Sequence, residues 1–500
     1  MTADPVAPLG ARVMRSSLWM LMNSAITRLI TFLAQIALSV LLTKSDFGIY
    51  AAAMSISAFL TNLRGAGMGQ WLTQGGRERL EGRAGHAFWT SLAFNIGLGL
   101  LIVALAIPAA TFFGDERVRL VLFISGASFP LITVGSYFKQ VMAIELRMRE
   151  ITTIEIISAV LRYGLIVMLA ATGFGPLSFV IPLPISFALE GILGYLYTRD
   201  KAWRRRSSPR EWLPLILGNR WILVGTFVTT VALQGDYFVL GKLATLTTLG
   251  TYYFAYQMTY MSAGLITENA RRVLFPGLVA VPADRRPAAA LRAATICTVL
   301  GAPLLLMLGA AIGPLENFIW HGKWADAVAP IQLFSLGLPL QLMTTVTQSS
   351  LQSDGRFRLW SMVNGIRGCC VVVGAMIGGT LYAGNIHMIA TIMTVSFAVA
   401  NATQVWIAYR VQEIRLSAVL RACFASVVIA PLSLCATIGM TRVVDVDPIW
   451  ELALGLAVFG VLWIALTAVF DGTALRMGAA ALHSALRPGT KARLNRGAAS

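Results

Sequence analysis

Fourteen apolar stretches, each long enough to cross a membrane, constrain this chain more than any other feature. A bilayer core requires about 20 mostly apolar residues in a helix, and no segment between these stretches is long enough for a folded soluble domain. The stretches cover residues 16–42, 47–63, 85–111, 119–139, 151–171, 176–198, 212–240, 247–267, 289–312, 327–350, 359–382, 387–409, 417–440 and 449–470. The sequence therefore predicts an all-α polytopic membrane protein with about 14 transmembrane helices.

The composition supports this interpretation. Hydrophobic residues make up 57% of the 500 residues and charged residues only 13%, with a mean hydropathy of +0.71. These values exclude a soluble enzyme. The five cysteines lie within apolar stretches and show no metal-ligand spacing, so we expect them to be packing residues.

The basic residues predict the orientation of the chain. With the N-terminus placed in the cytoplasm, 30 of the 40 Lys and Arg residues fall in cytoplasmic loops and tails. Because such loops retain positive charge, we expect both termini of an inner-membrane protein to be cytoplasmic. The net charge of +17 then reflects orientation and contact with membrane lipids, and no nucleic-acid partner is expected.

An internal repeat organises the spans. The segment Phe47–Tyr50 recurs 202 residues later as Leu249–Tyr252, and Pro130-Leu131 recurs 209 residues later as Pro339-Leu340. Six spans separate the matched segments, so the two halves share one orientation, as in parallel-repeat transporters. Convergent loop chemistry is the alternative explanation of the matches.

The repeat predicts a division of the chain into two parallel six-helix bundles followed by a helix pair. The predicted parts are an N-terminal bundle (1–198), a basic cytoplasmic linker (199–211), a C-terminal bundle (212–410), an extra transmembrane hairpin (411–470) and a basic cytoplasmic tail (471–500). Two bundles of this kind suit alternating access across a central cavity.

Three arginines within the apolar stretches are candidate ligands for an anion. Arg28, Arg162 and Arg367 lie in the first, fifth and eleventh spans, where an unpaired charge is costly unless it faces water or a partner. Guanidinium groups match phosphate oxygens well. Pairing of Arg162 with Glu155 or Glu190 is the structural alternative.

Polar and aromatic side chains at helical spacing predict a hydrated lumen. Glutamines on three such stripes, and tyrosines four residues apart in the eighth span, could contact sugars. These candidate contacts are Gln35, Gln234, Gln341, Gln348, Tyr252 and Tyr256, with Tyr260 continuing the tyrosine row. Interhelical hydrogen bonding and core packing are the alternatives.

Two intramembrane carboxylates are candidates for ion coupling. Glu190 and Asp236 lie in the sixth and seventh spans, where buried carboxylates can serve as proton or sodium sites. The sequence contains no catalytic triad, nucleotide-binding loop or metal motif. We therefore expect no cofactor and no enzyme activity, with possible coupling to Na⁺ or H⁺.

Several phrases of the sequence resemble those of the polysaccharide transporter (oligosaccharide flippase, Wzx-type) family of the multidrug/oligosaccharidyl-lipid/polysaccharide superfamily. They are Leu42–Ala51, Asp236–Leu243, Leu249–Tyr252, Ala255–Gln257 and Leu274–Pro276. The resemblance implies a MATE-like fold of twelve to fourteen helices. It also implies translocation of undecaprenyl-pyrophosphate-linked oligosaccharide repeat units for exopolysaccharide or lipopolysaccharide synthesis, beside polysaccharide polymerase and chain-length or export proteins.

The working hypothesis is an alternating-access flippase whose pyrophosphate site contains Arg28, Arg162 and Arg367. Two alternatives remain at the sequence level. One is an ion-coupled multidrug exporter of related fold, which a positively charged cavity would serve poorly. The other is a membrane-embedded polysaccharide polymerase or ligase, which usually carries a large outer loop that this chain lacks.

Overall fold

The structure, a computed structural model, describes residues 26–63, 68–205, 207, 220–279, 281–282, 284–441 and 447–486. Every regular element within these ranges is a helix, as the sequence predicts. Nine described helices are long and apolar enough to cross a membrane. They are Ala84–Phe113, Arg117–Ile144, Met148–Ala171, Gly175–Thr198, Arg286–Trp320, Ala325–Ser353, Arg358–Leu381, Ile386–Val411 and Pro448–Phe470. The count of about 14 stays a prediction.

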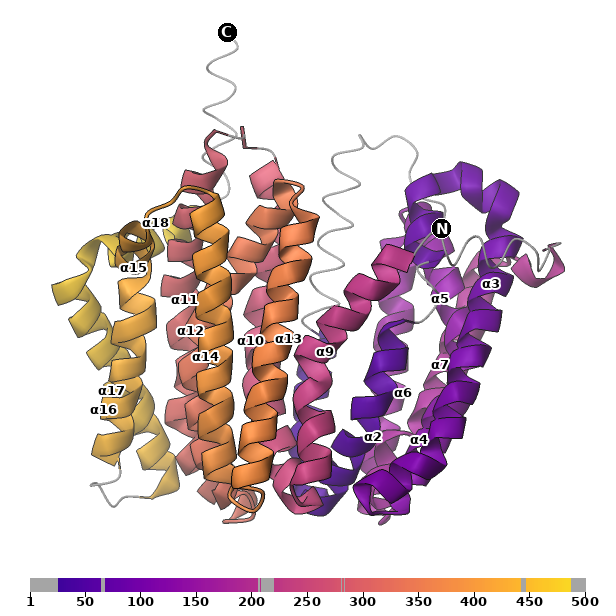
Figure 1. Ribbon diagram of the computed structural model, residues 1–500, viewed down its shortest axis with the longest axis horizontal. Helices are drawn as coiled ribbons and strands as arrows, with labels where there is room; N and C mark the ends of the chain where they lie inside the picture. Colours follow the sequence, from indigo (N-terminus) through magenta and orange to yellow (C-terminus); the bar gives the residue numbers. More distant parts are fainter. Residues whose placement is uncertain are drawn as a thin grey trace, which may run out of the picture. The chain divides into compact units, whose positions relative to one another are not determined.

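The chain forms two compact units (Figure 1). The first comprises Met1–Phe254 and Val371–Ile389, and the second comprises Ala255–Cys370 and Ala390–Ser500. Three helices contribute residues to both units: α10 (Leu246–Val279), α13 (Phe357–Leu381) and α14 (Ile386–Val411). The predicted bundle boundaries follow the sequence repeat instead, and they stay a prediction.

The first unit is a bundle in which α3 packs on α4 and α5, α5 packs on α7, and α2 packs on α9. Its first described element is the short apolar helix Ile26–Leu41. Its other elements are α2 (Lys44–Asn62), α3 (Met68–Phe113), α4 (Arg117–Ala127), α5 (Phe129–Ile144), α6 (Met148–Ala171), η2 (Gly175–Phe179), α7 (Pro182–Thr198), η3 (Ala202–Arg204) and α9 (Arg220–Leu243).

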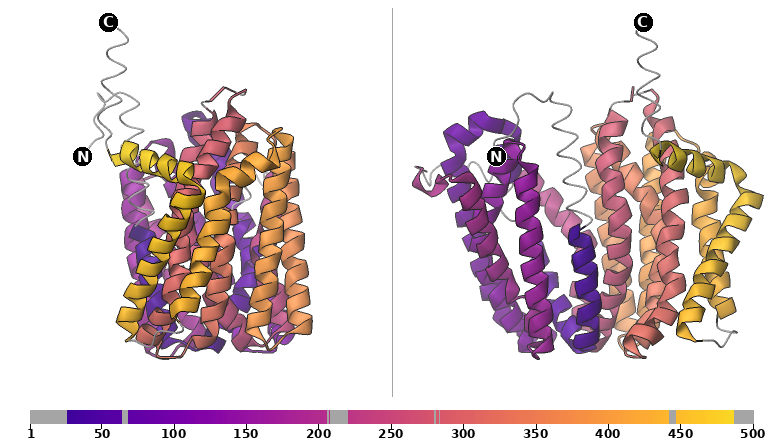
Figure 2. Two further views of the ribbon diagram at one scale, coloured as in Figure 1. Left: turned by 90° about the vertical axis from the view of Figure 1, so that its left-hand side faces the viewer. Right: turned by 180° about the vertical axis from the view of Figure 1, so that it is seen from behind.

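The second unit is built around α11, which packs on α12 and on the C-terminal helices. Besides the shared helices, its elements are α11 (Arg286–Leu315), η5 (Glu316–Trp320), α12 (Ala325–Ser353), α15 (Leu416–Phe424), η6 (Ala425–Ile429), α16 (Ala430–Thr441), α17 (Pro448–Phe470) and α18 (Gly472–Leu486). Figure 2 shows the last helix, α18, lying across the upright helices of this unit.

The starts of α2 and α10 have the same local chemistry, 202 residues apart. Thr43 Oγ1 accepts from the Asp46 amide, and the Asp46 carboxylate accepts from the Thr43 amide, which completes a capping box. At the repeated position Thr248, the backbone amide donates to Thr245 Oγ1 at 3.1 Å. The repeat therefore preserves a helix start as well as a sequence phrase.

Two segments outside the predicted spans are helical. α3 begins at Met68, so the loop expected before residue 85 is largely helix. Its first turns contain Arg77, Arg79 and Glu81, which disfavour a membrane interior but are compatible with a helix in water. The predicted tail likewise begins with the helix α18. Hydropathy identifies membrane spans only. The first part of α3 is too polar, and α18 too short, to be identified in this way.

Candidate functional site

Four charged side chains cluster between α5, α6 and α7 of the first unit. Lys139 Nζ lies 3.0 Å from Glu190 Oε2 and 3.7 Å from Glu155 Oε1. Arg162 approaches the other oxygen of the same carboxylate, with Nη2 3.5 Å from Glu190 Oε1. Glu190 therefore bridges two cations that come from different helices.

Glycines allow the helices to approach closely enough for these contacts. A Cβ added at Gly135 of α5 would lie 2.9 Å from the Glu190 Cβ of α7, and one at Gly194 would lie 2.6 Å from the Phe138 Cβ. Small residues at such crossings are typical of membrane helix packing. The close α5–α7 crossing brings Lys139 within hydrogen-bond distance of Glu190.

The α7 side also orients Arg162. Its Nε donates to Ser186 Oγ at 3.0 Å, and its guanidinium carbon lies 5.0 Å from the centre of the Phe187 ring. Together with the Glu190 contact, these interactions hold the guanidinium group against α7. A guanidinium presents its donors in a rigid plane, so its orientation decides which anions it can bind.

The cluster is formally neutral but unevenly exposed. The Lys139 and Arg162 side chains are each 25% exposed and Glu155 is 34% exposed, whereas Glu190 is 10% exposed. Paired charges are tolerated in a membrane interior, where isolated ones are costly. Both cations are therefore partly exposed beside the carboxylates that pair with them.

Sequence reasoning missed Lys139 because the predicted fourth span ended at that residue, which assigned its charge to a loop. In the structure Lys139 lies on α5, which continues to Ile144. The sequence signal for Lys139 was its spacing of four residues from Gly135, because this spacing places both residues on one face of the helix. For Arg162, the structure shows the pairing with Glu190 that the sequence left open.

Asp236 and Tyr252 form a second polar contact in the first unit. The Tyr252 hydroxyl donates to Asp236 Oδ2 at 2.6 Å, and the Tyr237 amide donates to Oδ1 at 2.9 Å. Asp236 and Tyr252 are both fully buried. The candidate ion-coupling carboxylate thus accepts from a tyrosine that the sequence had suggested as a sugar contact.

The other two tyrosines of the row belong to the second unit. The Tyr256 and Tyr260 rings stack with centroids 4.0 Å apart, and Tyr256 also meets Phe334 and Phe397. Arg367 is 7% exposed, and its Nη2 donates to the Tyr260 hydroxyl at 3.0 Å. The tyrosine row is therefore split, and its later part holds an arginine.

The remaining candidates stay predictions. Gln35 and Gln348 are buried, whereas Arg28, Gln234 and Gln341 are half-buried. Gln35 Nε2 has no hydrogen-bond partner among the described residues. Arg28 and Arg162 belong to the first unit and Arg367 belongs to the second. That the three arginines form one pyrophosphate site stays a prediction.

Two threonines of α12 form side-chain hydrogen bonds within their own helix. Thr344 and Thr345 both donate to the Gln341 carbonyl oxygen, at 2.8 and 3.1 Å. Such bonds allow hydroxyl groups to be buried in an apolar helix. Within the described ranges, no three His, Cys, Asp or Glu side chains are grouped so that they could hold a metal ion.

The sequence matches a known family and two curated relatives. The family model described as "Polysaccharide biosynthesis protein" matches residues 37–329. The succinoglycan biosynthesis transport protein ExoT of Rhizobium meliloti (strain 1021) is 24% identical over 381 residues, which cover 75% of this chain and 77% of ExoT. An uncharacterized membrane protein in the cps region of Klebsiella pneumoniae is 17% identical, with coverages of 70% and 73%.

Two solved structures share the fold. The lipid II flippase MurJ in an inward closed conformation matches with a TM-score of 0.72 and 12% identity, over 92% of this chain and 99% of MurJ. A multidrug resistance MATE family transporter of the MOP superfamily, inward-facing, matches with a TM-score of 0.58 and 14% identity, over 79% and 95% of the two chains. The chain is therefore a multi-pass membrane protein that belongs to the polysaccharide biosynthesis protein family and has the MurJ and MATE fold.

Proposed function

We propose that this protein is a flippase that moves undecaprenyl-pyrophosphate-linked oligosaccharide repeat units across the bacterial inner membrane by alternating access. The family match and the transport role named for ExoT support export in polysaccharide synthesis. The observation that carries the proposal is the bridge of Lys139 and Arg162 by Glu190 inside the first bundle, because this pair of cations suits an anionic headgroup.

In this mechanism the pyrophosphate displaces Glu190 from its two cations. Phosphate oxygens would accept from Lys139 Nζ and from the Arg162 fork, and the released Glu190 carboxylate would take up a proton or Na⁺. Substrate binding and ion coupling would then share one residue. Asp236, with its short bond from Tyr252, is the second coupling candidate.

The rest of the substrate would meet the other candidates. Arg28 and Arg367 would add positive charge along the route, and Gln35, Gln234, Gln341 and Gln348 would offer hydrogen bonds to sugar hydroxyl groups. The stacked Tyr256 and Tyr260 rings provide an aromatic surface beside Arg367. The polyprenyl chain would stay in lipid, with both protein termini in the cytoplasm and a polysaccharide polymerase as the consumer of the product.

Deletion of the gene tests the proposal. Lipid-linked oligosaccharide should accumulate on the cytoplasmic face and surface polymer should disappear, and the wild-type gene should restore export. The double substitution Lys139→Ala and Arg162→Ala should fail to restore it while the protein stays inserted. Arg119→Ala is the matched control, since Arg119 is exposed and pairs with the exposed Glu116 at 3.2 Å. Normal polymer export in the deletion strain would refute the flippase assignment.

A further inference from the structure

Two short amphipathic helices flank the C-terminal hairpin, outside every candidate residue above. α15 (Leu416–Phe424) precedes the apolar helix Ala425–Thr441, and α18 (Gly472–Leu486) follows α17. Both helices pack on α11. In both views of Figure 2, α18 lies across the upright helices of the second unit. A membrane-spanning helix would instead run parallel to them.

α15 buries one face and exposes the other. Val419 and Cys423 lie in the apolar cluster that also contains Ala294 of α11. On the opposite side, Leu420 is 60% exposed, and Arg421 is exposed beside it. The helix thus has an inner apolar face for the protein and an outer face that combines an apolar side chain with a cation.

α18 repeats this arrangement further along α11. A Cβ added at Gly478 would lie 3.2 Å from Val299 Cγ1 and 3.4 Å from Leu300 Cδ2, a turn or two beyond the contact of α15. Arg476 and Met477 are exposed on its outer side. The outer faces of both helices therefore carry an arginine next to an apolar side chain.

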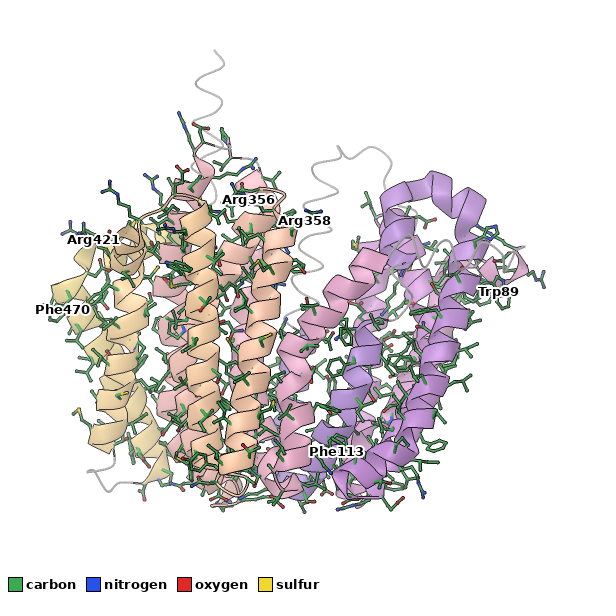
Figure 3. The ribbon with its side chains drawn as sticks, viewed as in Figure 1. Trp89, Phe113, Arg356, Arg358, Arg421 and Phe470 are labelled. Atoms are coloured by element: carbon green, nitrogen blue, oxygen red, sulfur yellow. The ribbon has the colours of Figure 1, made fainter. Side chains whose placement is uncertain are left out.

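The length of α17 gives the depth at which α18 begins. Its 23 residues extend about 34 Å at 1.5 Å per residue, close to the roughly 30 Å of a hydrocarbon core. Its last residue, Phe470, is 67% exposed. α18 therefore begins near the boundary between the hydrocarbon core and the headgroups. Figure 3 shows Arg421 and Phe470 on the same flank of the second unit, at the left of the view.

From these placements we propose that the outer faces of α15 and α18 bind the headgroups of anionic phospholipids. An amphipathic helix with arginines on its polar side lies in the plane of the membrane interface, and each arginine near an anionic surface adds attraction. Arg415, Arg421 and Arg476 are exposed and would contact the phosphates. The carboxylates on the flanks are Glu413 and Asp471, and Asp471 already accepts from the Thr473 hydroxyl at 3.0 Å.

The test measures stabilisation of the purified, full-length protein by lipid. Phosphatidylglycerol should raise the melting temperature of the wild type, and phosphatidylcholine should raise it much less. The double substitution Arg421→Gln and Arg476→Gln should weaken the apparent affinity for phosphatidylglycerol by on the order of tenfold, as expected for the loss of two charges near the headgroups. The pair Arg421→Lys and Arg476→Lys should retain binding, because the charge is kept.

The matched control is the double substitution Arg356→Gln and Arg358→Gln. These arginines are exposed and lie at the start of α13, not on α15 or α18 (Figure 3). Arg356 Nη1 donates to the Val411 carbonyl oxygen at 3.3 Å, which leaves Arg358 as the member of the pair without a bond to the described residues before α15. The control should keep the wild-type affinity. Equal stabilisation by both lipids, or equal loss in the control and test variants, would overturn the proposal.

Discussion

Gly48 and Gly250 occupy matching positions in a close crossing of α2 and α10. An added Cβ at Gly48 would collide with the Leu246 carbonyl oxygen, and one at Gly250 would collide with the Lys44 carbonyl oxygen. Both glycines and both carbonyl groups are 202 residues apart, the offset of the sequence repeat. The two helices therefore cross with local two-fold symmetry inside the first unit, and the repeated Gly is required by the space available.

Alanine at either glycine should destabilise the protein to a similar extent. We expect Gly48→Ala and Gly250→Ala each to cost about 2 kcal/mol or more, because a methyl group would push the helix backbones apart. Thermal unfolding in detergent would measure the loss. Gly97→Ala is the control, since a Cβ there meets nothing within 4 Å. A wild-type melting temperature for Gly48→Ala would contradict the crossing.

The bridge at Glu190 predicts strong coupling between Lys139 and Glu190. Lys139→Met and Glu190→Gln should each destabilise the protein, because each leaves a partly buried charge without its closest partner. The double variant should recover part of the loss, with a coupling free energy of about 1–3 kcal/mol. A double-mutant cycle of unfolding free energies measures this value. Strictly additive losses would show that the two side chains do not interact.

Removal of one hydroxyl should expose the role of Tyr252. Tyr252→Phe leaves the buried Asp236 carboxylate without a 2.6 Å hydrogen bond, at an expected cost of about 1–3 kcal/mol. Tyr382→Phe, at an exposed tyrosine of the first unit, should change the unfolding free energy very little. Similar values for the two variants would mean that the Asp236 contact adds nothing to stability.

The contact of Asp115 and Arg117 predicts a pH dependence outside the spans. The side-chain hydrogen bonds from Arg117 lower the pKa of Asp115 below its usual value. A carboxylate with a lowered folded-state pKa adds stability above its unfolded pKa, near 3.9, and loses it as pH falls toward the folded value. Melting temperatures between pH 6 and pH 3 should therefore fall less for Arg117→Gln than for the wild type. An unchanged pH profile would show that this pair is not linked to folding.

The fold was predictable from the sequence because spans depend on hydropathy, which each segment carries by itself. The candidate site was less predictable, because ion pairs between side chains depend on which helices pack together. Arg162 is near the middle of α6, as expected, but only the packing of α5 on α7 shows that Glu190 also holds Lys139. The even spacing of Tyr252 and Tyr256 likewise gave no sign that one binds Asp236 and the other stacks on Tyr260.

The buried Arg367 offers a test that separates charge from structure. If its charge attracts the pyrophosphate, Arg367→Lys should retain part of the export, whereas Arg367→Gln should lower export of lipid-linked oligosaccharide at least tenfold, because lysine keeps a cation but lacks the planar fork. Surface polymer per inserted protein is the measurement. Tyr260→Phe removes the bond to Arg367 but keeps the guanidinium group, so its export should be at least that of Arg367→Lys. If Arg367→Gln exports like the wild type, Arg367 serves only to hold Tyr260 in the stack, and the cationic route must be sought at Lys139 and Arg162 alone.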